Sequence, residues 1–125
     1  LRFGGLIGYD RNPAKFLANK TTISGESPVN LIHRDDCVNI ITQILEQDIW
    51  GEVFNVTSPE HPTKREFYTK AKLSKGFEVP EFVENEDLQW KIISSKKVQE
   101  VLNYQFKHIT LNMIFLLIVI HNILY

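Results

Sequence analysis

The chain alternates short apolar runs with segments whose apolar residues recur at helical spacing. Four runs predict strands, at Leu1–Ile7, Thr21–Ile23, Val29–Ile32 and Val53–Val56. Leu1–Ile7 is apolar almost throughout and predicts a buried strand that ends among glycines. A polar turn at residues 24–26 is expected to join the second and third strands.

The clearest predicted helix follows the third strand. Asp35 is in position to be its N-cap, and Asp35 and Asp36 place negative charge at the positive end of the helix. Gly51 lies just beyond its end. The helical spacing predicts one buried face made of Cys37, Val38, Ile41, Ile44 and Leu45.

Three further helices are predicted with less regular patterns. Thr63 and Glu66 have the spacing of a capping box, and the helix they begin should run to about Lys75. A short helix is expected from Pro13 to Ala18, and a last one from a serine cap at 94 or 95 to Leu102. Short strands that alternate with helices predict an α/β fold.

Composition excludes some classes of function. The net charge is −1 over 125 residues, and no basic stripe is present, so a nucleic-acid partner is not expected. The one cysteine, Cys37, cannot form an internal disulfide, which suits a cytoplasmic location.

The two ends of the chain have unusual features. The sequence begins at Leu1 and its only methionine is Met113, so we expect a portion of a longer protein. Residues 109–125 form an apolar tail, but its unbroken apolar run, at 113–120, is short for a membrane span of roughly 20 residues. A buried or partner-covered segment is favoured; a tail from a shifted reading frame and membrane contact are the alternatives.

Three segments resemble, in order, motifs of one protein family. Leu1–Gly8 resembles the strand and loop that follow a catalytic Tyr-x-x-x-Lys helix, Asn30–Val38 a "strand, then Asp, then helix" signature, and Gly51–Val56 a "Gly-x-x-Tyr/Phe-Asn-Val/Ile" strand. The family is the extended, or an atypical, short-chain dehydrogenase/reductase family of the NAD-dependent epimerase/dehydratase type. The resemblance covers residues 1–108 as the C-terminal, substrate-side portion of a Rossmann-type protein and leaves out 109–125.

The resemblance implies a longer parent that binds NAD or NADP. This chain has no Gly-rich loop opening a helix, so the cofactor-binding half is expected to be absent and the fragment to bind no cofactor alone. Tyr68 and Lys72 have the Tyr-x-x-x-Lys spacing, but they lie after the third motif and are predicted to be surface helix residues. No catalytic residue is therefore assigned. The expected partners are a small-molecule substrate, the missing N-terminal cofactor domain and a possible second copy in a homodimer.

Five residues are candidates for substrate binding: Gly4, Gly5, Arg11, His33 and Arg34. A structural role is the competing interpretation for each: a buried histidine for His33, and exposed structural arginines for Arg11 and Arg34.

Three residues are predicted to be structural: Asp35 and Asp36 through the helix start, and Asn55 through bonds to neighbouring backbone. The four histidines are scattered without metal-ligand spacing, so no metal site is predicted.

Two departures from the family bear on the substrate. Sugar-nucleotide enzymes of the family often have Asn where this chain has Gly5, and Arg, to pair with phosphates, where it has Val29. An atypical branch is therefore favoured over a nucleotide-sugar enzyme.

Three functions remain open. The first is the substrate-binding portion of an epimerase, dehydratase or reductase that acts on a sugar-like or other hydroxylated small molecule, inactive as this fragment. The alternatives are a non-catalytic NAD(P)-binding or regulatory protein of the same fold, and a small independent interaction domain that uses the apolar tail.

Overall fold

Short parallel strand pairs organise the chain. The computed structural model describes residues 1–17, 22–84, 88–109 and 124. Within them, β1 (Arg2–Phe3) pairs with β5 (Asn55–Val56), β2 (Gly5–Ile7) with β4 (Leu31–His33), and β3 (Thr22–Ser24) with β6 (Glu81–Val83). The predicted α/β alternation is confirmed. The second and third predicted strands exist as β3 and β4, which pair with β6 and β2 respectively.

The first predicted strand is two strands that break at Gly4. There the chain leaves β5 and joins β4: the Gly4 amide donates to Val56, and the Gly5 amide donates to Asn30. A Cβ at Gly4 would lie 2.5 Å from the Asn30 carbonyl oxygen, so only glycine fits this crossing. The prediction of one buried strand is wrong for its first part, because Leu1 and Phe3 are exposed.

Helix α1 (Arg34–Glu46) begins two residues earlier than predicted. The N-cap is His33, whose Nδ1 accepts from the Asp35 amide; Asp35 lies inside the first turn and is not the cap. The predicted apolar face is also partly wrong. Cys37 is buried as expected, with its thiol pKa raised to about 11 by burial, and Ile44 is half-buried, but the main core residue of the face is Ile40. The exposed members are Val38, Ile41 and Leu45.

The other helices begin where the sequence predicts, although the predicted serine cap of the last one is not formed by Ser95. Helix α2 (Lys64–Ser74) begins at the predicted Thr63–Glu66 capping box. The short predicted helix is a 3-10 turn, η1 (Pro13–Lys15), capped by Asn12. Helix α3 (Lys96–Leu102) follows Ser95, whose hydroxyl binds Thr57 in place of capping. None of the helices in the described ranges is long and apolar enough to cross a membrane.

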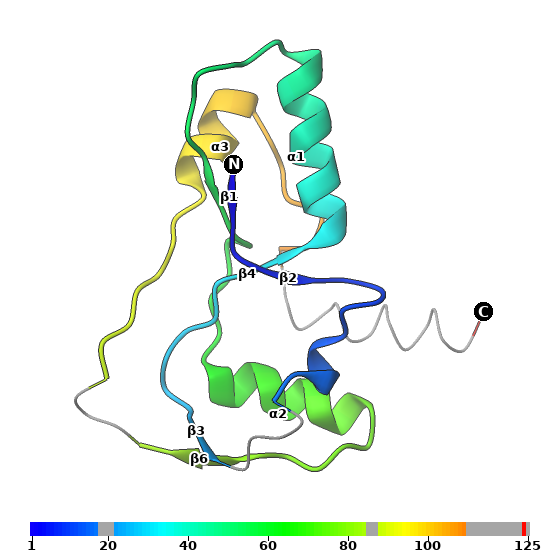
Figure 1. Cartoon of the computed structure of the whole chain (residues 1–125), viewed down its shortest axis with the longest axis vertical. Helices are drawn as coiled ribbons and strands as arrows, with labels where there is room; N and C mark the ends of the chain where they lie inside the picture. Colours follow the sequence, from blue (N-terminus) through cyan, green and yellow to red (C-terminus); the bar gives the residue numbers. More distant parts are fainter. Residues whose placement is uncertain (18–21, 85–87, 110–123, 125) are drawn as a thin grey trace.

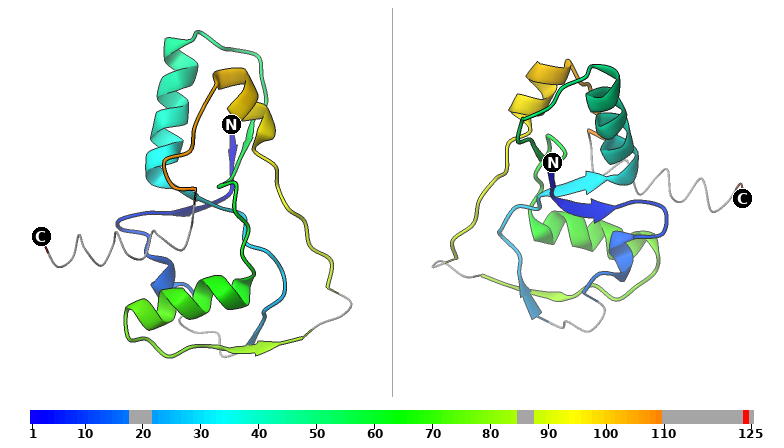
Figure 2. Two further views of the ribbon diagram at one scale, coloured as in Figure 1. Left: turned by 180° about the vertical axis from the view of Figure 1, so that it is seen from behind. Right: turned by 45° about the horizontal axis from the view of Figure 1, so that its top comes forward.

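Two core clusters lie on opposite sides of the β2–β4 pair (Figures 1 and 2). We call α1, α3, β1 and β5 the α1 lobe, and η1, α2, β3 and β6 the α2 lobe. Neighbouring residues of one strand serve different lobes: Leu31 belongs to the α2-lobe core and Ile32 to the α1-lobe core, as the two-residue period of a strand requires. The short central pair therefore ties both lobes together.

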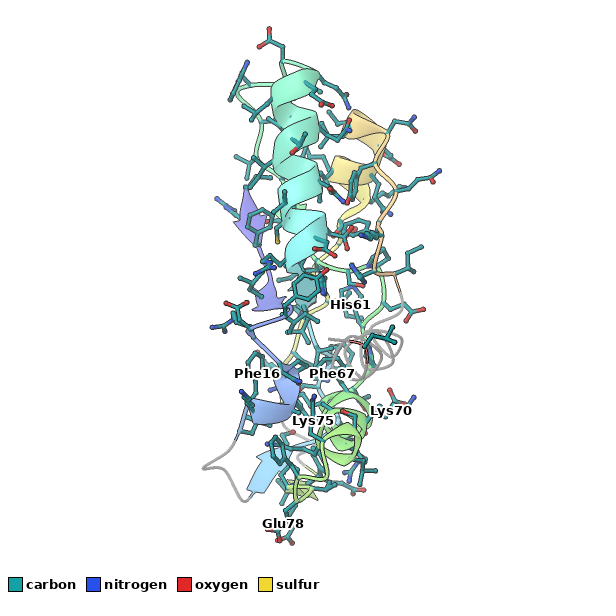
Figure 3. The ribbon with its side chains drawn as sticks, turned by 90° about the vertical axis from the view of Figure 1, so that its right-hand side faces the viewer. Phe16, His61, Phe67, Lys70, Lys75 and Glu78 are labelled. Carbon is teal, nitrogen blue, oxygen red and sulfur yellow. The ribbon has the colours of Figure 1, made fainter. Side chains whose placement is uncertain are left out.

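Tyr68 and Lys72 are buried, at 8% and 5% exposure, so the prediction that they are surface residues is wrong. Both lie on the inner side of α2, and Tyr68 packs in the α2-lobe core with Phe67 and Ala71. Phe16, from the chain just after η1, packs against the same cluster (Figure 3). Of the apolar tail, residues 109–125, the structure describes only residues 109 and 124.

Candidate functional site

Polar side chains gather where the parallel strands β2 and β4 end. β2 ends at Ile7 and is followed by Gly8 and Tyr9, and β4 ends at His33, directly before α1. Ligands of α/β proteins bind outside the carboxyl ends of parallel strands. This end of the β2–β4 pair is therefore the candidate functional site.

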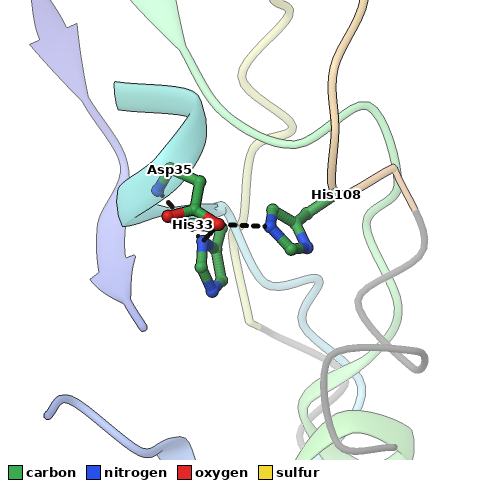
Figure 4. Close-up of side chains that lie close together, drawn as sticks. All are labelled: His33, Asp35 and His108. Atoms are coloured by element: carbon green, nitrogen blue, oxygen red, sulfur yellow. Dashed lines mark hydrogen bonds and ion pairs between the residues drawn. The ribbon is translucent and has the colours of Figure 1, made fainter. Parts of the chain in front are cut away.

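His33 lies beneath the surface of this site. It is 3% exposed, and its ring lies nearly perpendicular to that of Tyr9 with 5.3 Å between the centroids. On another side it stacks on His108 with 3.8 Å between the centroids (Figure 4 draws both histidines). Burial, together with the neighbouring His108, lowers the pKa of His33 to about 4. The imidazole is neutral near pH 7, which its capping bond to the Asp35 amide requires.

Asp35 joins the parts of the site. One carboxylate oxygen accepts from the Tyr9 hydroxyl at 2.7 Å and from His108 Nε2 at 3.0 Å (Figure 4 draws the second). Burial alone would raise the pKa of Asp35, but the hydrogen bonds from Tyr9 and His108 hold it below its usual value. The same bond to Asp35 raises the pKa of the Tyr9 phenol, which therefore stays protonated.

The two candidate arginines flank Tyr9 at the surface. The Arg34 guanidinium lies 4.6 Å from the Tyr9 ring centroid and pairs with Asp10 at 3.4 Å. Arg11 donates from Nε to the Leu6 carbonyl at 3.0 Å. Both arginines are exposed, so a rim of hydrogen-bond donors surrounds the half-exposed Tyr9.

The candidates do not all converge. His33, Arg11 and Arg34 lie at the carboxyl end of the β2–β4 pair, whereas Gly4 and Gly5 lie at its start, where backbone packing explains them. In the described part of the chain the Asn55 side chain makes no hydrogen bond. The backbone-organising role predicted for it belongs to Asn30, whose amide bonds the backbone of Lys91 and Ile93.

Sequence reasoning named Asp36 as a structural residue but missed the contacts that it makes. Asp36 is 1% exposed and accepts from the Tyr104 hydroxyl at 2.6 Å, the Lys107 amide at 2.7 Å and the His108 amide at 3.1 Å. Its structural role was predicted, but through the helix end and not through this anchor. The sequence signal for this anchoring role is a second acidic residue at the start of the helix, in addition to the one that a cap needs.

His33, Asp35 and His108 have ligand atoms within 4.8 Å of one another, although they are far apart in sequence. His33 Nδ1 is engaged as the helix cap, and the Asp35 oxygen already accepts two hydrogen bonds. The positive end of α1 also opposes a cation there. The group is best described as a hydrogen-bonded cluster that fixes residues 104–108 to the start of α1.

No known protein-family profile matches the chain. The chain is 34% identical over 109 residues to the protein YeeZ of Escherichia coli K12, an alignment that covers 86% of this chain and 40% of YeeZ. It thus spans less than half the length of this relative.

Solved structures match the fold over nearly the whole chain. A functionally unknown conserved protein from Silicibacter pomeroyi matches with a TM-score of 0.74 at 18% identity, over 96% of this chain and 48% of that one. The Bacillus cereus UDP-glucuronic acid 4-epimerase, solved with UDP-glucuronic acid and NAD, matches at 0.67 and 18%, over 99% and 45%. A human epimerase family protein with NADPH matches at 0.69 and 20%, over 94% and 46%.

These likenesses confirm the resemblance drawn from the three motifs. The chain has the fold of about half of an NAD-dependent epimerase/dehydratase protein. The two ligand-bound relatives hold NAD and NADPH respectively.

Proposed function

We propose that this chain is the C-terminal, substrate-side portion of an NAD(P)-dependent epimerase, dehydratase or reductase that acts on a hydroxylated small molecule. The observation that carries the proposal is the rim of Tyr9, Arg11 and Arg34 at the carboxyl ends of β2 and β4, on a fold shared with such proteins. The two guanidinium groups offer hydrogen-bond donors to the hydroxyl groups of a substrate, and the Tyr9 oxygen, whose proton is donated to Asp35, offers an acceptor.

The rim binds and orients; it supplies no acid or base. The Tyr9 phenol keeps its proton because its pKa is raised by the bond to Asp35, and Asp35 is committed to Tyr9 and His108. Buried His33 supports Tyr9 from below and is a positioning residue. The hydride and proton transfers then belong to a cofactor-binding half outside this chain.

The substrate of this proposal need not carry a nucleotide. Val29 is 4% exposed and packs in the α2-lobe core, so no phosphate can be held from that position. At Gly5, a side chain would meet the Leu31 side chain at 2.6 Å. At both positions where sugar-nucleotide enzymes often place polar groups, apolar side chains fill the space in this chain.

The outer face of α1 supports the further part of this proposal, that the cofactor-binding half packs against the α1 lobe. Val38, Ile41 and Leu45 lie on one face of the helix, each more than 40% exposed. Ile41 and Leu45 line an apolar cavity of about 250 Å³ together with Leu1 and Trp50. Among the described strands, β1 has a partner on one edge only, so its other edge can extend a parallel sheet.

The test begins with the DNA that flanks this reading frame. The proposal expects an upstream Gly-rich βαβ unit and a Tyr-x-x-x-Lys, and a flank that encodes neither would end it. The full-length protein should bind NAD or NADP and turn over a hydroxylated substrate. Binding of the cofactor without turnover would favour the non-catalytic regulatory alternative.

Variants of the full-length protein test the rim itself. Arg34→Ala and Tyr9→Phe should raise KM about tenfold and leave the affinity for NAD(P) unchanged. Each removes a polar group that faces the substrate, together with an internal contact, to Asp10 for Arg34 and to Asp35 for Tyr9. Lys70→Ala, on the exposed side of α2, is the matched control and should change neither value. Unchanged KM in both rim variants would refute the assignment of the rim.

A further inference from the structure

Lys72 is a buried lysine without a described anionic partner. It is 5% exposed, and among the described residues its ammonium makes no hydrogen bond or ion pair. Its Nζ lies over the ring of Phe77, 5.7 Å from the ring centroid. Lysine is seldom buried to this extent unless it is paired, so the ammonium needs a partner or a route to water.

The backbone builds a pocket at this lysine. Helix α2 ends after Ser74, and Gly76 turns the chain with a φ of 67°, a left-handed conformation that favours glycine. The turn lets the Phe77 amide donate to the Lys72 carbonyl at 3.0 Å, which places Phe77 beside the lysine. η1 packs on the other side, with Ala14 fully buried.

The result is an open cavity of about 290 Å³ lined by Ala14, Lys15, Lys72, Phe77 and Glu78. Two lysines and one glutamate leave the lining with one net positive charge. Glu78 is exposed and lies at the outer end of the α2 lobe (Figure 3), so the inner charge is that of Lys72. The remaining walls are apolar: the Phe77 ring, the Ala14 methyl group and the lysine stems.

We propose that this pocket binds a small organic monocarboxylate with an apolar body. Lys72 pairs with the carboxylate, and Phe77 and Ala14 pack against the apolar part. A single negative charge fits better than the double charge of a phosphate, because Glu78 and the carbonyl end of α2 both add negative potential nearby. The proposal does not depend on the proposed function.

Phenylacetate is the probe for this pocket, added to the 125-residue chain and followed by NMR. Binding should perturb the Phe77 ring and Ala14 methyl resonances. Lys72→Met keeps the stem and removes the charge, so it should weaken binding about tenfold or more. Lys70→Met is the matched control: it makes the same charge change on the exposed side of α2 and should bind as the wild type does.

A second arm needs no variant and holds even if Lys72→Met fails to fold. Methyl phenylacetate has the same body without the charge and should bind at least tenfold more weakly than phenylacetate. Equal binding of acid and ester, or perturbation away from Phe77 and Ala14, would overturn the proposal. Inorganic phosphate that displaces phenylacetate at equal concentration would also overturn the carboxylate assignment. If phenylacetate does not bind at all, Lys72 only extends its ammonium to solvent and the site does not exist.

Discussion

The α1 lobe and the α2 lobe use similar parts but bury them differently. Helix α2 buries Phe67, Tyr68, Ala71 and Lys72 along its inner side, while α1 buries Asp36, Cys37 and Ile40 and leaves three large apolar side chains in solvent. The α1 lobe also has the more polar anchor, a buried carboxylate. The exposed apolar face of the α1 lobe is suited to pack against another domain, whereas the α2 lobe buries more of its apolar side chains in its own core.

The largest effect is expected from the α2-lobe core. Phe67→Ala removes a fully buried ring between η1 and α2 and should lower the free energy of unfolding by about 3–5 kcal/mol. Urea denaturation measures the loss. Leu73→Ala on the same helix, where the side chain is 63% exposed, is the control and should cost far less. Equal losses in the two variants would mean that α2 does not pack as described.

The polar anchor of the α1 lobe comes next. Asp36→Ala leaves the Tyr104 hydroxyl and two backbone amides without their acceptor, and should cost about 3 kcal/mol in the same measurement. Asp10→Ala, at an exposed carboxylate, should cost less than about 0.5 kcal/mol. A loss below 1 kcal/mol for Asp36→Ala would show that residues 104–108 are held by other contacts.

The pH dependence of stability separates the lobes further, because the buried histidine pair belongs to the α1 side. The pKa of His33 in the folded chain is about 4, below its ordinary value of about 6.5, so the folded state binds fewer protons than the unfolded state. The neutral His33 ring therefore makes its full contribution to the free energy of unfolding above pH 6.5. That free energy falls by about 2–3 kcal/mol through His33 as the pH drops from 6.5 to 4.

Asn in place of His33 isolates this effect. His33→Asn keeps an N-cap acceptor but cannot titrate, so its stability should fall less than that of the wild type between pH 6.5 and 4. His108, Asp35, Asp36 and Arg34 face the same ring and remain in the variant, which makes the difference between the two curves specific to His33. Parallel curves would contradict the lowered pKa.

The smallest effect is expected on the exposed face of α1. Ile41→Ser and Val38→Ser should each change the stability of the 125-residue chain by less than about 0.5 kcal/mol. In a full-length protein with a cofactor-binding half, the same changes should cost 1 kcal/mol or more if that half packs here. Equal small effects in both proteins would contradict the proposal that the cofactor-binding half packs against this face of α1.

Local signals in the sequence predicted the elements better than their burial. The Thr63–Glu66 capping box and the acidic start of α1 depend on neighbours within one turn, so they were predictable. The buried face of α1 was not, because Val38, Ile41 and Leu45 satisfy the helical period as well as Ile40 does. Periodicity gives the faces of a helix; only the packing decides which one meets the core.

The candidate site was predictable only in part, because some of its residues are far apart in the sequence. His33 and Arg34 were found because they end a strand and start a helix. His108 lies 73 residues from Asp35, and nothing local connects the two. Lys72 was predicted to lie at the surface because its helix follows the third motif, and its burial depends on how Gly76 returns the chain over α2.

The strand pairs also set the order in which the chain can be completed during synthesis. Gly5–Ile7 can pair once residue 33 has left the ribosome, but Arg2 and Phe3 must wait for residue 56, and β3 for residue 83. The Asp36 carboxylate waits longest, until His108 is made. We therefore expect β1 and β3 to stay unpaired longer than β2 as this part of the chain emerges from the ribosome.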